Sequence, residues 1–532
     1  MVCLLIAFAV VLHLLAPKKG KLASGRWAGR SEKNQARKIA LEQIGNRQKN
    51  EVSVWLGNLS SSNNTLFLPD AQRGISVIGG PGTGKTVSVI DRLALSVLAQ
   101  GFPAILYDFK YPAQSSRLAP YAAKCGYDVR IFAPGYPESE VCNPLDFLAD
   151  EQDAMMAGQL AEVLNANFKR NSNNQEDAFF SPAGIQLTEA LLLLAKSSKC
   201  PNLITCQELA SLETLPQYIQ ANRATLNPWV YKSFGQFIST AKSDRTIASI
   251  LGTANLNLTR LIKPDLLAAL CGPTTISTRL EGKQLLVIGL DREKRQVISP
   301  LIAAIVALLI NKNVSLPRHD PLFLLADEIP TLFLPSLHHY LNENREDGLC
   351  TVLGFQNLVQ MEKMYGRELA RAIVGGCATK VIFNPQDYDS AKLFSDFLGQ
   401  KEVHLRQQSY SRSHGKRNIT YTQQIQTKPL FDAADFLRLP KGRCLILNPH
   451  LARGNTAYIP LLKSIRLTRA YKRLLRWSTS RWEKVRAKLI QRSPQGKMDA
   501  RTLLLATEAI AEILPNSPEP NNNVQTILDK IL

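Results

Sequence analysis

The sequence contains none of the cysteine and histidine patterns that build zinc sites or disulfide frameworks. Its nine cysteines are scattered over 532 residues, no two form a C-x-x-C pair, and no cluster of histidines accompanies them. This arrangement argues against both scaffolds and is typical of a protein in a reducing compartment. We therefore expect nearly all of the cysteines to be small buried side chains of the core.

The sequence also lacks an apolar run of ordinary membrane-spanning length. Residues 2–16 form a run of fifteen residues without a charge, whereas a bilayer span takes about 20. The basic residues follow this run, which is unlike a signal peptide and places the bulk of the chain in the cytoplasm. We predict a short anchor over residues 1–16 in the inner (plasma) membrane; a peripheral helix and the remnant of a longer membrane region are the alternatives. A second apolar run, residues 298–310, is predicted to be a buried core helix.

Acidic residues are scarce relative to basic ones. The chain holds 64 Lys and Arg against 44 Asp and Glu, for a net charge of +20. Counting these residues gives +8 over 18–49, +5 over 401–428 and +11 over 463–501, so the remainder is slightly negative. Such basic segments suit nucleic acid or an anionic membrane surface; a solvated basic face without a partner is the alternative.

One segment fits the phosphate-binding pattern G-x-x-x-x-G-K-[ST]. Its residues are Gly79, Gly80, Pro81, Gly82, Thr83, Gly84, Lys85 and Thr86. Glycines let the backbone curl so that its N–H groups point at phosphate oxygens, the lysine faces the β- and γ-phosphates, and the threonine hydroxyl faces Mg²⁺. An apolar strand over 75–78 and an apolar helix over 87–98 flank the loop. The sequence therefore predicts a site that binds and hydrolyses a nucleoside triphosphate.

A second element supplies two carboxylates. Residues 322–326 read as an apolar strand that ends in Asp327 and Glu328. Asp327 is expected near Mg²⁺, and Glu328 is expected to polarise the attacking water. A glutamate beside the metal-binding aspartate is typical of RecA-like motor ATPases.

Further strands alternate with helices and indicate a mostly parallel sheet covered on both faces. Four segments instead show helical spacing, with no convincing strand among them: residues 154–164, 185–194, 215–223 and 247–261. We predict six regions: an anchor (1–16), a basic juxtamembrane linker (17–60), a first part of the nucleotide-binding domain (61–150), an all-α domain (151–272), a second part of the nucleotide-binding domain (273–462) and a basic helical tail (463–532).

Several short motifs, in this order, resemble the TraG/TraD-like coupling ATPases of type IV secretion and conjugation. The matching stretches are Gly25-Arg26-Trp27-Ala28, Asp108-Phe109-Lys110, Asn143-Pro144-Leu145-Asp146, residues 356–366, residues 384–398 and residues 437–447. Two departures stand out. The family usually has a two-span membrane hairpin, whereas this chain has one short apolar run. The family also has Pro and Gly at the positions of Phe109 and Tyr111.

The resemblance implies a RecA-like motor domain with an inserted all-α domain, working as a membrane-anchored homo-hexamer. Such proteins use ATP and Mg²⁺ to feed single- or double-stranded DNA, without reading its sequence, or a relaxase–DNA complex into a type IV secretion channel. The relaxase and channel proteins would be partners. Carried over by residue, Lys85 and Thr86 bind phosphate and Mg²⁺, Asp327 and Glu328 serve metal and water, and Gln356 senses the γ-phosphate. Arg345, expected in the helix before strand 351–355, matches an arginine finger for the neighbouring subunit.

Two basic segments are candidate DNA contacts. Arg412, Lys416 and Arg417 are expected in a polar loop near Tyr410, His414 and Tyr421, where aromatic rings among cations suit single-stranded bases. The tail carries Arg466, Arg469, Arg473, Arg476 and Arg481 with Trp477 and Trp482. It suits DNA, a relaxase or the membrane face, or it packs its tryptophans on the core.

Three functions are therefore compatible with the sequence. The first is a DNA-translocating ATPase of a conjugation system. The second is a motor that secretes protein effectors with identical nucleotide chemistry. The third is a membrane-associated scaffold whose nucleotide site only controls assembly. The third is disfavoured by the presence of Lys85, Asp327, Glu328 and Gln356, because a scaffold has no need of the water-activating Glu328.

Overall fold

The structure is a computed structural model and describes residues 23–48, 50–59, 65–171, 180–240, 243–316, 318–413, 416–494 and 500–516. The predicted anchor over residues 1–16 lies outside these ranges, as do His414 and the end of the predicted tail. The anchor therefore stays a prediction.

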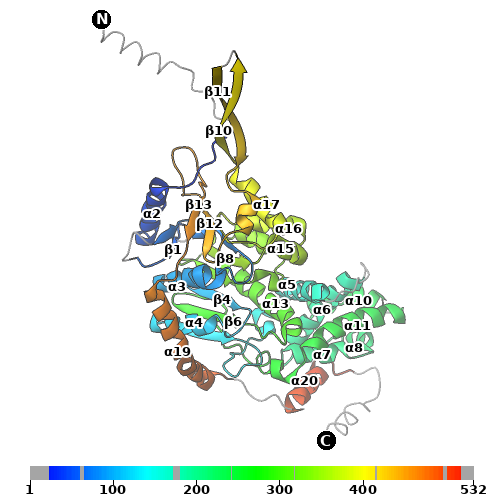
Figure 1. Cartoon of the computed structure of the whole chain (residues 1–532). Coiled ribbons are helices and arrows are strands. Elements are labelled where there is room, and N and C mark those ends of the chain that lie inside the picture. Colours follow the sequence, from blue (N-terminus) through cyan, green and yellow to red (C-terminus); the bar gives the residue numbers. More distant parts are fainter. Residues whose placement is uncertain are drawn as a thin grey trace.

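A nine-stranded sheet forms the centre of the molecule (Figure 1). Its strands, in spatial order, are β13 (Leu461–Ser464), β12 (Arg443–Leu447), β9 (Thr379–Ile382), β3 (Ile75–Ile78), β8 (Leu349–Phe355), β7 (Leu322–Ala326), β4 (Ala104–Asp108), β6 (Gln284–Gly289) and β5 (Asp128–Phe132). The seven strands from β9 to β5 are parallel, and β12 and β13 are antiparallel additions at one end. The predicted α/β class with a mostly parallel sheet is confirmed.

Side chains alternate between two hydrophobic cores, one on each face of the sheet. In β7, Leu322 and Leu324 belong to one core, whereas Phe323 and Leu325 belong to the other. Helices α3 (Asp91–Gln100), α4 (Ser115–Lys124) and α19 (Arg469–Arg492) contribute to the second core, and α5 (Ala154–Asn171) and α13 (Arg295–Val314) contribute to the first. Strands that are buried on both faces must be apolar throughout, which explains their continuous runs in the sequence.

Helix α13 contains the second apolar run of the sequence. It is the one helix, among the described residues, that is long and apolar enough to cross a membrane. Residues 298–310 are all buried within the protein. The prediction of a core helix is confirmed.

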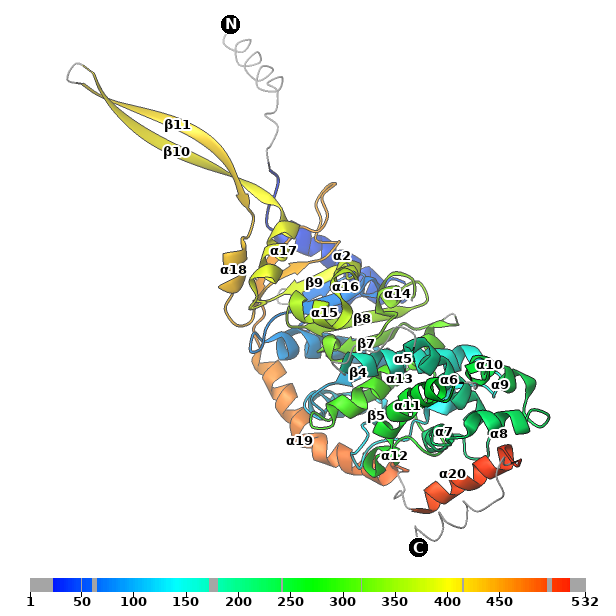
Figure 2. The same cartoon turned by 90° about the vertical axis from the view of Figure 1, so that its right-hand side faces the viewer.

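Helices alone, in the part that the structure describes, connect β5 to β6. They are α5, α6 (Phe180–Lys196), α7 (Leu203–Ala210), α8 (Leu215–Ala221), α9 (Pro228–Ser233), α10 (Gly235–Ser239), α11 (Asp244–Leu261) and α12 (Pro264–Leu267). They gather beside the sheet (Figure 2). The division of the chain into domains at the boundaries given above stays a prediction.

The segment after residue 22 ties several distant elements together. Gly25 donates a backbone hydrogen bond to Gln400, Ala28 donates one to Pro460, and the Trp27 ring meets Phe431 edge-on at 5.7 Å. Helix α2 (Arg30–Gly45) and the small sheet of β1 (Val54–Leu56) and β2 (Leu66–Leu68) follow. The described part of the expected linker, from residue 23 onward, is therefore folded onto the core.

One element contradicts the expectation for a polar loop. Strands β10 (Gln400–Ser413) and β11 (Lys416–Pro429) pair over their whole length as an antiparallel hairpin that projects from the molecule (Figure 2). Arg412, Lys416 and Arg417 lie in these strands rather than in a loop. The hairpin is rich in Gln, Ser and Thr, and its apolar residues alternate with polar ones only over short stretches, so most of its sequence is typical of a loop.

The remaining α-helices of the described residues follow β7 in the chain. They are α14 (Leu337–Asn342), α15 (Leu358–Tyr365), α16 (Arg367–Gly376), α17 (Tyr388–Leu398), α18 (Ala433–Leu437) and α20 (Ala500–Ile513). In α19, Trp482 is 5% exposed and packs in the second core. The tail helix is therefore attached to the domain rather than free in solvent.

Candidate nucleotide-binding site

The predicted phosphate loop follows β3 directly, at the carboxyl edge of the sheet. Gly82 and Gly84 have φ values of 77° and 98°, which L side chains rarely adopt. A single π-helical turn, Thr86–Ile90, comes next and continues into α3. The loop and the start of a helix therefore stand together, as anion binding at a helix N-terminus requires.

Thr86, which lies beyond the end of β3, and Asp327, directly after β7, meet at the carboxyl edge of the sheet. The Thr86 hydroxyl donates a hydrogen bond of 2.7 Å to Asp327 Oδ2. The other oxygen of Asp327, Oδ1, is buried and has no hydrogen-bond partner among the described residues. A hydroxyl beside a carboxylate with an unused buried oxygen is a donor set that suits Mg²⁺, so these residues fit the ion.

Glu328 lies between Lys85 and Gln356. Its Oε2 is 3.5 Å from Lys85 Nζ and accepts a 3.5 Å hydrogen bond from Gln356 Nε2. Glu328 Oε1 is buried and unpaired among the residues that the structure describes. The sheet order explains this meeting, because β8 lies between β3 and β7 and parallel strands end at the same edge. Five predicted site residues are thus in one place.

Arg345 is not among them. It lies in a turn between α14 and β8, not in the expected helix, because α14 ends at Asn342. It therefore lies at the amino edge of the sheet. The seven-residue length of β8 separates this edge from the phosphate loop by roughly 20 Å. The Arg345 side chain is 41% exposed and its nearest ion-pair partner, Glu346, is 3.8 Å away.

The structure adds a buried carboxylate that the sequence did not single out. Asp91, at the start of α3, is fully buried and pairs with Arg117 Nε at 2.6 Å and Gln114 Nε2 at 2.9 Å. Burial raises the pKa of Asp91 to about 6, and the charge of Asp327 adds to the rise. No sequence motif marks Asp91, because its burial and its ion pair arise from the packing of α4 onto α3.

Two of the short family motifs, residues 384–398 and 437–447, contact the phosphate loop. Gly80 donates to the Asn384 carbonyl at 2.8 Å, and Gly442 donates to the Thr83 carbonyl at 2.9 Å. Gln386 also lies here: a Cβ on Gly80 would stand 2.3 Å from its Oε1. Gln386 escaped prediction because only tertiary structure brings it to the loop. By contrast, Lys110 is exposed, with its ammonium 4.8 Å from the centre of the Phe109 ring.

This fold and this site define the class of P-loop nucleotide-binding α/β proteins. A family model described as the type IV secretion-system coupling protein DNA-binding domain matches residues 66–453. The chain belongs to this family, and the resemblance read from its motifs is confirmed.

A curated relative is also a coupling protein, and its match covers only part of each chain. The coupling protein TraD of Escherichia coli (strain K12) is 26% identical over 170 residues, which cover 31% of this chain and 24% of TraD. The match thus spans about a quarter of that relative's length.

Solved structures of a coupling protein share the fold. The bacterial conjugative coupling protein TrwBdeltaN70, in complex with sulphate, superimposes with a TM-score of 0.62 and 18% identity, covering 85% of this chain and 95% of that one. TrwB in complex with ADP and Mg²⁺ gives a TM-score of 0.56 and 18% identity, covering 75% and 87%.

Proposed function

We propose that this protein is a membrane-associated ATPase that couples DNA, or a relaxase–DNA complex, to a type IV secretion channel during conjugative transfer. The proposal rests on one observation, which is that Lys85, Thr86, Asp327 and Glu328 lie together. One buried oxygen of each carboxylate has no hydrogen-bond partner among the described residues. Membership of the coupling protein family supports it. A site that only held nucleotide would have no use for Glu328.

Each residue has a distinct part in the proposed reaction. The backbone of residues 79–84 and Lys85 hold the phosphates, while Thr86 and Asp327 hold Mg²⁺. Bound Mg²⁺ supplies charge neutralisation at the β- and γ-phosphate oxygens. Glu328 orients a water and accepts its proton, and Gln356, which already contacts Glu328, responds to the γ-phosphate. The solved TrwB complex with ADP and Mg²⁺ supports this choice of ligands.

The proposal includes a homo-hexamer because Arg345, the proposed arginine finger, lies away from the phosphate loop of its own chain. A guanidinium stabilises the negative charge that develops on the transferred phosphoryl group. Arg345 lies at the far edge of its own sheet, so it would serve the site of a neighbouring subunit.

DNA and the membrane are the partners of the proposed motor. DNA would be gripped through its phosphates, without sequence readout, and the basic hairpin β10–β11 is a candidate contact. An anchor over residues 1–16 would hold the protein at the inner membrane with the bulk of the chain in the cytoplasm. Relaxase and channel proteins are the further partners proposed from the family resemblance.

The steady-state ATPase rate of the full chain, with and without single-stranded DNA, tests the proposal. We expect DNA to raise the rate and Lys85→Ala to abolish it. Turnover that ignores DNA would favour a motor for protein effectors. No turnover, at concentrations that allow assembly, would favour the scaffold.

A further inference from the structure

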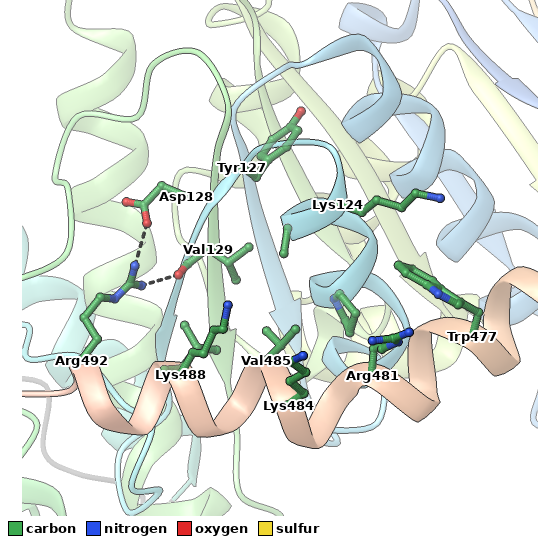
Figure 3. Close-up of a pocket in the computed structure, with 13 residues that line it drawn as sticks. Lys124, Tyr127, Asp128, Val129, Trp477, Arg481, Lys484, Val485, Lys488 and Arg492 are labelled. Carbon is green, nitrogen blue, oxygen red and sulfur yellow. Dashed lines mark hydrogen bonds and ion pairs between the residues drawn. The ribbon is translucent and has the colours of Figure 1, made fainter.

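A groove runs along the tail helix α19, on the side of the sheet where β5 forms the edge (Figure 3). Its walls come from α4, β5 and α19, and its volume is about 430 Å³. Trp477 lies at one end, and at the other Arg492 bonds to Asp128 and to the Val129 carbonyl. The stretch of α19 between these two residues is roughly 22 Å long, about four helical turns.

The floor of the groove is apolar and its rim is cationic. Pro120, Ala123, Val129, Val485 and Leu489 line the floor. Lys124, Arg481, Lys484 and Lys488 line the rim. None of these four forms an ion pair with another described residue; Lys124 instead lies 5.0 Å from the Trp477 ring centre. Four unneutralised cations around an apolar floor call for a ligand that is both acidic and apolar.

We propose that this groove, the α19 groove, binds an acidic amphipathic helix of a partner protein. The apolar stripe of such a helix would cover the floor, and its carboxylates would face Lys124, Arg481, Lys484 and Lys488. This is the helix-in-groove mode of recognition, with charge complementarity at the rim.

An added strand does not fit the groove, although β5 is the edge strand. The Val129 carbonyl is already bonded to Arg492, and the Ile131 carbonyl accepts a bond from the Glu140 amide. The acceptors that strand addition would use are therefore occupied, so the occupant bonds through its side chains.

Nucleic acid and membrane fit the groove less well than a protein helix. A phosphate backbone needs cations but has no use for a concave apolar floor. A bilayer is flat, and α19 lies on a different part of the molecule from the hairpin β10–β11, whose base pairs with Ser24 and Gly25 (Figures 1 and 2). A protein helix matches the length, the floor and the rim together.

The groove is also connected to the nucleotide site. Ser478 of α19 donates to the Arg117 carbonyl at 2.7 Å, and Arg117 pairs with Asp91, which lies at the start of α3 after the phosphate loop. Tyr471 donates a 2.9 Å bond to the Val87 carbonyl, one residue after Thr86. A partner bound between α4 and α19 would thus contact two helices that are linked, through Arg117 and Tyr471, to the residues following the phosphate loop.

Fluorescence anisotropy of a labelled 16-residue peptide, with leucines at helical spacing and glutamates elsewhere, tests the proposal on the full chain. We expect saturable binding that weakens when salt is raised from about 50 to 200 mM. The double variant Lys484→Glu/Lys488→Glu should weaken it by about tenfold or more. Lys472→Glu/Arg473→Glu makes the same charge change on α19 outside the groove and should leave binding within about twofold.

Lys124→Glu, on the opposite wall, gives a second variant in case the first disturbs α19. A thermal melt of each variant establishes that it is folded. Equal weakening by the groove variants and by the Lys472/Arg473 control would overturn the proposal. So would equal binding of a scrambled peptide that has lost its apolar stripe. Preferential loss of binding to a 20-nucleotide oligothymidine, or to vesicles with anionic lipid, in Lys484→Glu/Lys488→Glu would assign the groove to nucleic acid or to membrane instead.

Discussion

Asp327 and Glu328 are neighbours in the chain, yet their side chains face different groups. Asp327 accepts from the Thr86 hydroxyl, whereas Glu328 lies between Lys85 and Gln356. The alternation of side chains at the end of β7 separates them. Asp327 is therefore suited to the metal, and Glu328 is suited to a water beside the γ-phosphate.

This difference predicts the effect of Glu328→Gln. The amide keeps the shape of the side chain but does not accept a proton, so turnover should fall by roughly 10²–10⁴-fold. ATP binding should be retained, because Lys85 and Thr86 are untouched. Single-turnover hydrolysis and equilibrium binding of labelled ATP measure the two separately. Glu281→Gln, at an exposed site, is the control; retention of wild-type turnover in Glu328→Gln would remove its proposed role.

A second residue-scale prediction concerns Asp91 and pH. Burial raises its pKa from 3.8 to about 6 in the folded protein, so the stability it contributes is fully present below pH 4 and is lost as pH rises through 6. The stability of Asp91→Asn relative to wild type should therefore rise between pH 4 and pH 7, by on the order of 3 kcal/mol. Thermal melts across this range test it, with Asp265→Asn, at an exposed site, as the control. A relative stability that falls with pH would mean that the Arg117 ion pair outweighs burial.

At the scale of elements, the sequence predicted the parallel strands well. Strands β3 and β7 begin and end at the predicted residues, because burial on both faces leaves an uninterrupted apolar run. The apolar strand that ends at residue 326 pointed to Asp327 and Glu328 directly after it. Lys85 and Thr86 were predicted from the phosphate-loop pattern, and Gln356 was predicted from the family resemblance.

Elements without that constraint were missed. The hairpin β10–β11 packs mainly on itself, so it contains few apolar residues and only a short apolar alternation. Arg345 was expected in a helix, but its segment turns before β8. Gln386 and Asp91 reach the site through contacts between elements that are distant in sequence, and a single sequence does not record such contacts.

The attachment of α19 to the phosphate loop gives an element-scale prediction. Tyr471→Phe removes the hydroxyl that bonds the Val87 carbonyl, which should cost about 1 kcal/mol of stability. It should also weaken ATP binding, because the bond lies in the π-helical turn that begins at Thr86. Tyr388→Phe, at a side chain that is 60% exposed, should change neither the melting temperature nor the binding of labelled ATP. Unchanged ATP affinity in Tyr471→Phe would show that the tail helix is only a structural support.

The hairpin β10–β11 gives a second element-scale prediction. Changing Arg412, Lys416 and Arg417 together to Ala removes three of its cations and should weaken stimulation of the ATPase by single-stranded DNA. Basal turnover should persist, since the hairpin stands apart from the nucleotide site (Figure 2). The control changes Lys363, Arg367 and Lys392, three exposed cations elsewhere, to Ala. Stimulation that survives the hairpin change, or falls equally in the control, would place the DNA contact elsewhere.

At the scale of the whole molecule, the site and the proposed finger lie at opposite edges of one sheet. If Arg345 is the arginine finger, as we propose, a single chain does not complete its own site. It would do so only when a neighbour presents its amino edge to the phosphate loop, as closed rings of identical subunits allow. Hydrolysis at shared sites is the central claim of this account.

Mixing two inactive variants, Lys85→Ala and Arg345→Ala, and measuring DNA-stimulated ATPase tests that claim most directly. Each variant alone should be inactive. In an equal mixture, a site is complete when an Arg345→Ala chain supplies Lys85 and a Lys85→Ala neighbour supplies Arg345, which random assembly gives for about a quarter of the sites. We predict recovery of activity toward that fraction. No recovery, from variants that assemble normally, or full activity of Arg345→Ala alone would contradict the account.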